Sequence, residues 1–367
     1  RRLKEYASNA SSALFVTGDL GAKTTSIIAP YIDLREVLKD PERLQNNLKA
    51  RNLSFEVESK NEKFPNENDL EHLKIHKNIV REDLKFVAPM IIELEKLTIL
   101  EGLKLPNYLH QDTPFEDEVV KGGRESEEKL ENSNLSHIEI GKKLDLLEFT
   151  NPVNYYLLNE AALFEIAVTE YFASSLQKSL GFINFSNADF CQSVIIEGVG
   201  HEAKEVNAQT FLVGGASLEP FCAYHCKNTV HASALPLRYV TQGRSYSNLS
   251  LYDLEGLYNV IQTNCVHIFA ATKDDEAAMM SEFNLLYSFV PASQLNVWES
   301  LRVSFQILSP YHGRYIEVGN LAISDDFISK RLRMHYHEVK RDLKNTLKES
   351  FKRYSVLLKI LIIFGIS

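Results

Sequence analysis

The chain has 367 residues, 44% of them hydrophobic and 24% charged, and a formal net charge of -9. This composition is typical of a globular protein, and the length suits a large domain with a smaller appendage. The acidic balance excludes a protein coated in basic surface, so any nucleic-acid contact requires a local patch. Four cysteines are too few for a disulfide scaffold, and we expect free thiols in a reducing compartment.

Residues 1–30 are predicted to be a flexible or transit-like N-terminus. The segment opens with Arg1-Arg2-Leu3-Lys4 and continues with several serines and alanines. A basic, Ser/Ala-rich opening is typical of a mitochondrial transit peptide or its remainder.

Residues 31–104 are predicted to form a helical-hairpin arm. Apolar side chains recur at helical spacing between Asp33 and Arg51, with Pro41 at a helix start. After a polar turn, a second helix between Leu73 and Leu94 carries the spacing of a coiled-coil seam. An ordinary pair of packed helices explains the same spacing as well as a dedicated binding arm does.

Residues 105–150 are predicted to be a junction and charged linker, followed by a core over 151–367. In this core, helical spacing runs from Tyr155 to Ser179, whereas short apolar runs that suggest strands include Ser193–Ile196, Gln262–Ala271 and Leu301–Leu308. Helices beside antiparallel strands indicate the α+β class.

A last long helix is predicted over roughly Asp325 to Leu361. It would place four lysines on one stripe able to follow a phosphate backbone, namely Lys340, Lys344, Lys348 and Lys352. A solvated helix face explains the same stripe. The apolar end is shorter than the ~20 residues of a membrane span, so we expect it to pack on the fold and predict no membrane contact.

Several stretches resemble seryl-tRNA synthetase, in order and at compatible spacing from about residue 32 to 336. They are Ile32-Asp33-Leu34-Arg35, Leu105-Pro106-Asn107-Tyr108-Leu109-His110, Ala161-Ala162-Leu163-Phe164-Glu165 with Gly181-Phe182, Leu212-Val213-Gly214-Gly215-Ala216, Leu235-Pro236-Leu237-Arg238-Tyr239 and Gly313-Arg314-Tyr315-Ile316-Glu317. The resemblance implies a class II antiparallel sheet flanked by helices and preceded by a short antiparallel helical-hairpin arm. It also implies a mitochondrial matrix location and a dimer interface at the helix from Tyr155 to Leu180.

The chain departs from this family where the resemblance implies ATP and serine binding. A serine replaces the arginine of motif 2, and neutral residues replace most of the expected charges, although Glu317 is retained. Arginine holds the charge that develops on the α-phosphate, and serine cannot supply it. The degenerate positions are Gly215, Ser217, Ser247, Asn259, Asn264, Gln306, Glu317 and Ile323.

The sequence also lacks a recognisable motif 3 with its arginine and last core strand, either genuinely or through a truncated gene model. We therefore predict no catalytic residue, no cofactor and no metal site. Cys222, His225, Cys226 and His231 do not match a zinc-binding spacing, and we expect them to be buried structural residues.

The resulting prediction is a non-catalytic paralogue, similar to the seryl-tRNA synthetase-like mitochondrial proteins of insects. Its expected role is that of a dimerisation and regulatory partner of the authentic mitochondrial seryl-tRNA synthetase, or of itself. The alternatives are an RNA- or DNA-binding protein using the basic C-terminal helix and an active serine–tRNA ligase using Glu219 and Glu317.

Overall fold

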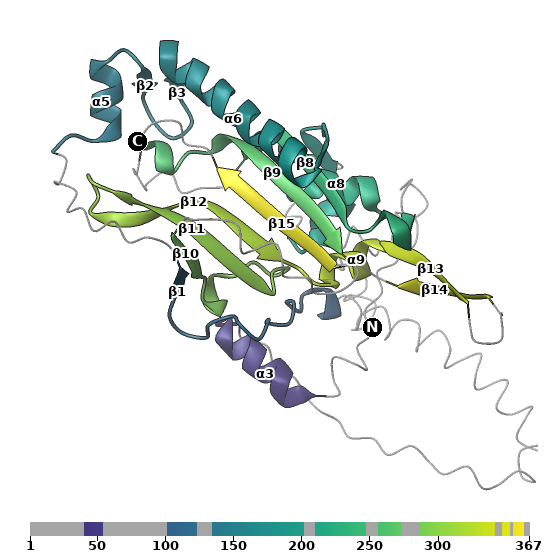
Figure 1. The fold of residues 1–367 in the computed structure, drawn as a ribbon. Coiled ribbons are helices and arrows are strands. Elements are labelled where there is room, and N and C mark those ends of the chain that lie inside the picture. The colour runs from purple at the N-terminus through teal and green to yellow at the C-terminus, as the bar shows by residue number, and fades with distance from the viewer. Residues whose placement is uncertain are drawn as a thin grey trace, which may run out of the picture.

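A computed structural model describes residues 40–53, 101–122, 134–201, 210–246, 256–272, 286–341, 347–352 and 355–362. The transit-like segment, the second arm helix, Ser247 and Lys344 lie outside the described residues. Figure 1 shows a central sheet with helices on both faces, so the predicted α+β class is confirmed.

The sheet has eight strands in the order β1-β10-β11-β12-β15-β9-β8-β4. In that order they span Val119–Gly122, Leu286–Phe289, Leu301–Ser309, Arg314–Ile323, Ser355–Ile362, Gln262–Thr272, Leu237–Tyr246 and Ile183–Asn184. All neighbours are antiparallel except β4 and β8. The predicted strands Gln262–Ala271 and Leu301–Leu308 are therefore confirmed.

Helix α6 (Asn159–Leu180) lies along one face of the sheet (Figure 1). Ala173 on this helix packs with Phe182, Val240, Val266 and Ile268 in one apolar cluster. The helix starts four residues later than predicted, because Tyr155–Leu157 forms β3 and pairs with β2 (Leu147–Phe149).

Three helices cover the other face, where they share an apolar cluster with β8 and β9. They are α7 (Ser193–Val199), α8 (Leu218–His225) and α9 (Phe327–Leu332). The prediction of a strand at Ser193–Ile196 is wrong. Its β-branched residues are buried on all sides between the other helices, and this packing outweighs their strand propensity.

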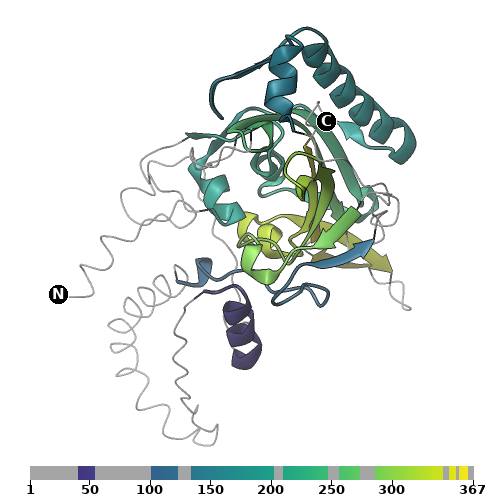
Figure 2. The same ribbon diagram turned by 90° about the vertical axis from the view of Figure 1, so that its left-hand side faces the viewer.

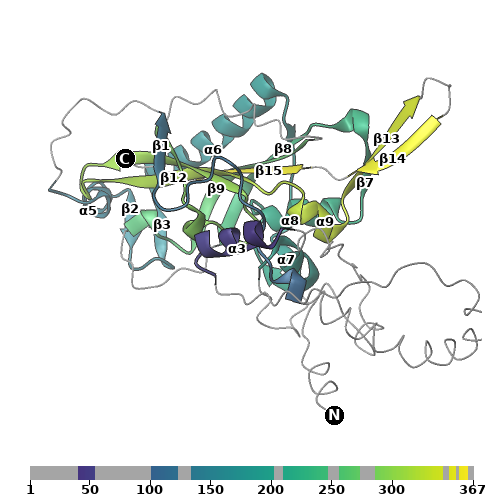
Figure 3. The same ribbon diagram turned by 90° about the horizontal axis from the view of Figure 1, so that it is seen from below.

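The predicted helix from Asp325 to Leu361 is also wrong. Helix α9 ends at Arg333, whose φ of 54° is left-handed, and the chain then forms β13 (His335–Arg341) and β14 (Leu347–Lys352). These strands pair as a hairpin that projects from the sheet, with β7 (Thr229–His231) alongside (Figure 3). Lys340 is paired with Lys348 in this hairpin, so the predicted helical lysine stripe does not exist.

The apolar segment after the hairpin forms β15 rather than a helix end. It pairs with β12 on one side and with β9 on the other. A short apolar run without alternation suits a strand buried on both faces. The expectation that this end packs on the fold as the end of a helix is therefore wrong, because β15 lies in the middle of the sheet.

Part of the charged segment predicted as a linker forms a strand. Its residues Val119–Gly122 form β1 and pair with β10 at the edge of the sheet. Residues 123–133 lie outside the described part. Downstream, α5 (His137–Lys143) carries a capping box formed by Ser136 and Glu139.

The base of the predicted arm is attached to the core by a buried arginine. In the view of Figure 2, α3 (Pro41–Ala50) lies below the sheet, and Arg51 follows it. The Arg51 guanidinium donates hydrogen bonds to the backbone carbonyls of Asn107, Asn296 and Glu299. Burial lowers the pKa of Arg51 to about 10, so the side chain stays charged at neutral pH.

Arg51→Ala should therefore destabilise the chain by about 3 kcal/mol, because it removes three charge-assisted hydrogen bonds, and the Glu299 carbonyl loses the donor that Arg51 supplies. Urea denaturation followed by the fluorescence of Trp298, the single and buried tryptophan, measures this loss. Lys49→Ala on the exposed side of α3 is the matched control. Equal stability of the two variants would contradict the assignment of Arg51 as the anchor of α3.

Candidate functional site

A row of polar side chains crosses the middle of the sheet. Ser288, Ser304 and Asn320 lie opposite one another on β10, β11 and β12, while Thr241 lies opposite His267 on β8 and β9. The register through β15 aligns the two groups. All five side chains are at most 8% exposed. Directly opposed residues share a face of a sheet, so this row is the floor of the candidate site.

Glu317, the one acidic residue that the sequence retains, lies beside this floor and is held by the chain itself. Arg302 Nη2 donates to Glu317 Oε1 over 2.6 Å. Ser304 Oγ donates to Oε2 over 2.7 Å, and Asn320 Nδ2 donates to Oε1 over 2.9 Å. Both carboxylate oxygens therefore have internal donors.

Arg302 is also close to a second carboxylate. Burial alone would lower the pKa of Arg302, but the charges of Glu317 and Glu299 raise it above its usual value. Burial raises the pKa of Glu299, although Arg302 and bonds from Asn296 partly oppose this effect. The guanidinium is thus the counter-charge for two carboxylates at this end of the site.

Gln306 lies where the resemblance implies an acidic residue. Its side chain is hydrogen-bonded to a carboxylate from a distant part of the chain. Its Nε2 donates to Glu118 Oε1 over 2.7 Å. Ser288 Oγ donates to the same oxygen. Glu118 comes directly before β1 at the sheet edge. The pairing of β1 therefore places a carboxylate beside Gln306, where the resemblance implies an acidic residue.

The positions predicted to be a degenerate serine site, Gly215 and Ser217, lie in or next to a tight loop between β6 (Thr210–Leu212) and α8. Gly215 N donates to Asp189 Oδ1 over 2.7 Å, and the Gly215 carbonyl accepts from Asn187. Gly214 has a φ of 90°, and a Cβ there would lie 2.1 Å from the Arg244 carbonyl oxygen, so only glycine fits. Ser217 Oγ donates to the Val213 carbonyl over 2.5 Å, so its hydroxyl is engaged locally.

His267 is a site residue that sequence reasoning missed. It is fully buried beneath the loop, and its Nδ1 donates to the Ala216 carbonyl. Its Nε2 is buried and has no hydrogen-bond partner among the described residues. Burial lowers the pKa of His267 to about 4, despite the opposing effect of the Ala216 bond. A histidine within an apolar strand run was the available signal.

Two predicted positions lie away from the floor. Asn264 alternates with Cys265, whose Sγ lies 4.0 Å from the Ala216 carbonyl, and so faces the opposite side of β9. Ile323 packs in an apolar cluster with Phe289 and Leu301. Asn259 follows the 3₁₀ turn η3 (Gly256–Tyr258) at the entry to β9.

Glu219 does not replace the missing serine-site acid. It lies in α8 rather than on a strand, it is buried, and its Oε1 is 3.5 Å from His201 Nε2. Burial raises the pKa of Glu219, and His201 partly opposes this. The carboxyl therefore points to an internal partner.

The described residues contain no group of three or more His, Cys, Asp or Glu side chains arranged to hold a metal ion. All four cysteines are free, and burial raises the pKa of each thiol. Cys222 and His225 are buried as predicted, whereas Cys226 is half-buried and His231 is exposed.

Across the described part of the chain, no helix has the length and apolar character to span a membrane.

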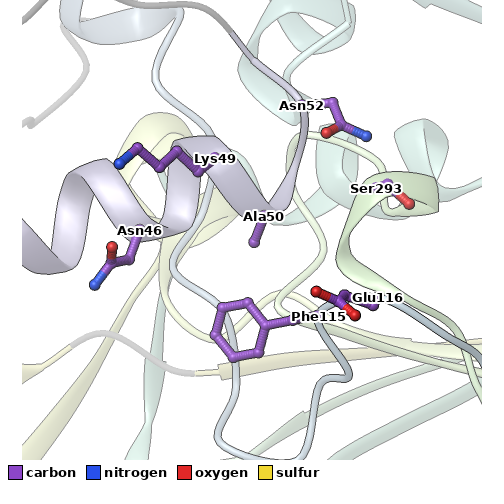
Figure 4. A pocket seen from close by; sticks show the side chains of 7 residues that line it. All are labelled: Asn46, Lys49, Ala50, Asn52, Phe115, Glu116 and Ser293. Carbon is purple, nitrogen blue, oxygen red and sulfur yellow. The ribbon is translucent and has the colours of Figure 1, made fainter.

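A pocket of about 480 Å³ lies apart from the sheet floor, between α3 and the 3₁₀ turn η5 (Ala292–Gln294). Figure 4 shows Phe115 and Glu116 on one side and the end of α3 on the other. Its lining residues are Asn46, Lys49, Ala50, Asn52, Phe115, Glu116 and Ser293. These residues do not form a recognisable catalytic arrangement.

No protein-family model matches the chain. The serine–tRNA synthetase-like protein Slimp of Drosophila melanogaster is 30% identical to it, over 90% of this chain and 83% of the fly protein. The mitochondrial serine–tRNA ligase of Mus musculus is 25% identical over 69% of this chain and 56% of its own length.

Solved structures show the same fold. The seryl-tRNA synthetase of Pyrococcus horikoshii, complexed with ATP, superposes with a TM-score of 0.64 at 15% identity. This match covers 90% of the present chain and 92% of the other. The described sheet with its flanking helices is thus a class II synthetase fold.

Acidification should destabilise the fold through His267. Its pKa is about 4 in the fold against an ordinary 6.5, so the unfolded chain binds the proton more readily. The stabilisation is complete above pH 6.5 and is lost as the pH falls toward 4. Urea denaturation across this range should show a smaller pH dependence in His267→Gln. Some dependence should remain, because burial lowers the pKa of His225 to about 4 as well. An unchanged dependence in the variant would contradict this assignment.

Proposed function

Because this chain belongs to the seryl-tRNA synthetase family, we propose that it is a non-catalytic paralogue acting as a dimerisation and regulatory partner of the authentic mitochondrial seryl-tRNA synthetase. The observation that carries this proposal is the outer face of α6. Four large apolar side chains on this helix, Leu163, Phe164, Ile166 and Tyr171, are 54–69% exposed. Globular proteins usually cover such a group of large exposed apolar side chains with another surface.

The loss of catalysis is supported by the internal bonds of the site. An active site for ATP and serine requires charges that are free to meet a substrate. Here Arg302, Ser304 and Asn320 all donate hydrogen bonds to the Glu317 carboxylate. The Gln306 amide donates to the Glu118 carboxylate. A nucleotide or its metal ion would have to displace these bonds without gaining the arginine that motif 2 lacks.

The choice of partner is supported by the relatives and by the chemistry of α6. The mitochondrial serine–tRNA ligases of Mus musculus and Bos taurus resemble this chain, and this resemblance supports a mitochondrial ligase as the partner that covers α6. Isologous pairing with a second copy is the competing outcome.

The purified chain should not form seryl-adenylate. Serine-dependent exchange of labelled pyrophosphate into ATP is expected at the level of a no-enzyme blank, because the Arg302 guanidinium beside Glu317 is already paired with that carboxylate. The authentic mitochondrial enzyme is the positive control. Exchange that exceeds the blank and disappears in Glu317→Gln would overturn the proposed loss of activity.

Co-expression with the authentic mitochondrial seryl-tRNA synthetase, followed by light scattering, tests the partner. We expect a one-to-one complex that Phe164→Asp weakens at least tenfold, since a charge would be buried at its centre. Phe115→Asp is the matched control, because Phe115 is 61% exposed but lies near α3. A complex of this chain with itself alone would favour the competing outcome, and a monomer would exclude both.

A further inference from the structure

One histidine joins α5 to the turn before β9 through a single hydrogen bond. Leu257 N donates to His137 Nε2 over 3.0 Å. The approach is close, because a Cβ on Gly256 would lie 2.5 Å from the same nitrogen, and Gly256 has a φ of 70°. The His137 ring also packs edge-on against Tyr258, with centroids 4.6 Å apart.

This contact exists only when His137 is neutral. Its Nε2 accepts a hydrogen bond from the Leu257 N–H, so the proton of the neutral ring is on Nδ1. Protonation of Nε2 would place two N–H groups against each other. Half-burial of the ring lowers the pKa of His137, and the charge of nearby His312 lowers it further.

Among the described residues, the charge that acts on His137 is that of another histidine, His312. The ring centroids of Tyr258 in η3 and His312 are 6.0 Å apart. In the turn between β11 and β12, the ring centroids of His312 and Tyr311 are 5.0 Å apart. On α5 itself, the Glu139 carboxylate is bonded to Ser136 N and Oγ. An imidazolium at position 137 would therefore face a second histidine and a backbone donor.

We propose that His137 is a pH-sensitive latch that holds the entry of β9 against α5 and releases it on acidification. The apolar cluster beneath the latch is small, with Leu147, Leu257 and Val260 as its buried members. Among the described residues, loss of the hydrogen bond leaves this cluster, with Ile138 packed against it, and the ring contact to join the two elements. Release therefore frees η3 and the adjoining residue Asn259 while the central sheet stays folded.

Amide hydrogen exchange on the full chain tests the latch. The protection of the Leu257 amide is corrected for its intrinsic exchange rate at each pH. It is then compared with the protection of the Phe269 amide in the centre of β9. Between pH 7.5 and 4.5, Leu257 should lose protection by about tenfold per pH unit below the pKa of His137. Phe269 should retain more of its protection, since its amide lies in the fully paired region between β8 and β15.

Two variants make the assignment specific. In His137→Gln a side-chain oxygen can accept from Leu257 at every pH, so the pH dependence should disappear. In His312→Gln the loss of a like charge should move the transition to higher pH. The latch is refuted if Leu257 and Phe269 lose protection in parallel, or if His137→Gln keeps the local transition of the unmodified chain.

Discussion

The pairing of β15 on both of its edges is the constraint on which the rest of the core depends. It joins β12 to β9, and through them the two halves of the eight-stranded sheet. The site has contributions from both halves. Glu317 and its donors come from β11 and β12, whereas His267 comes from β9 and contacts the loop before α8. The register of one strand therefore sets the position of these groups relative to each other.

The candidate site is a polar floor whose groups bind one another. Arg302 neutralises Glu317, Glu118 reaches Gln306 across the sheet edge, and Ser217 bonds to its own loop. Buried polar groups are costly unless they are hydrogen-bonded, so a site without an external ligand is stable only when internal partners replace it. This arrangement supports the proposal that the chain acts through an outer surface such as α6.

Much of the fold was predictable from the sequence, and the family resemblance is confirmed by the fly relative. The C-terminal part was misread because lysines at every fourth residue fit both a helix face and alternate positions of a strand. The site was harder to predict. Glu118 and Gln306 are 188 residues apart, and only the pairing of β1 with β10 brings them together. The dihedral reversal at Arg333 that ends α9 has no signal in residue type.

The place of β15 also has a consequence for folding during synthesis. Every other described strand of the sheet leaves the ribosome before residues 355–362. Until then, the facing edges of β9 and β12 have no neighbour, and each exposes unpaired backbone groups that invite association with other chains. The long-range contacts that close the sheet also form slowly. Nascent chains of this protein should therefore depend on chaperones until residues 355–362 have left the ribosome and β15 can pair with both of its neighbours.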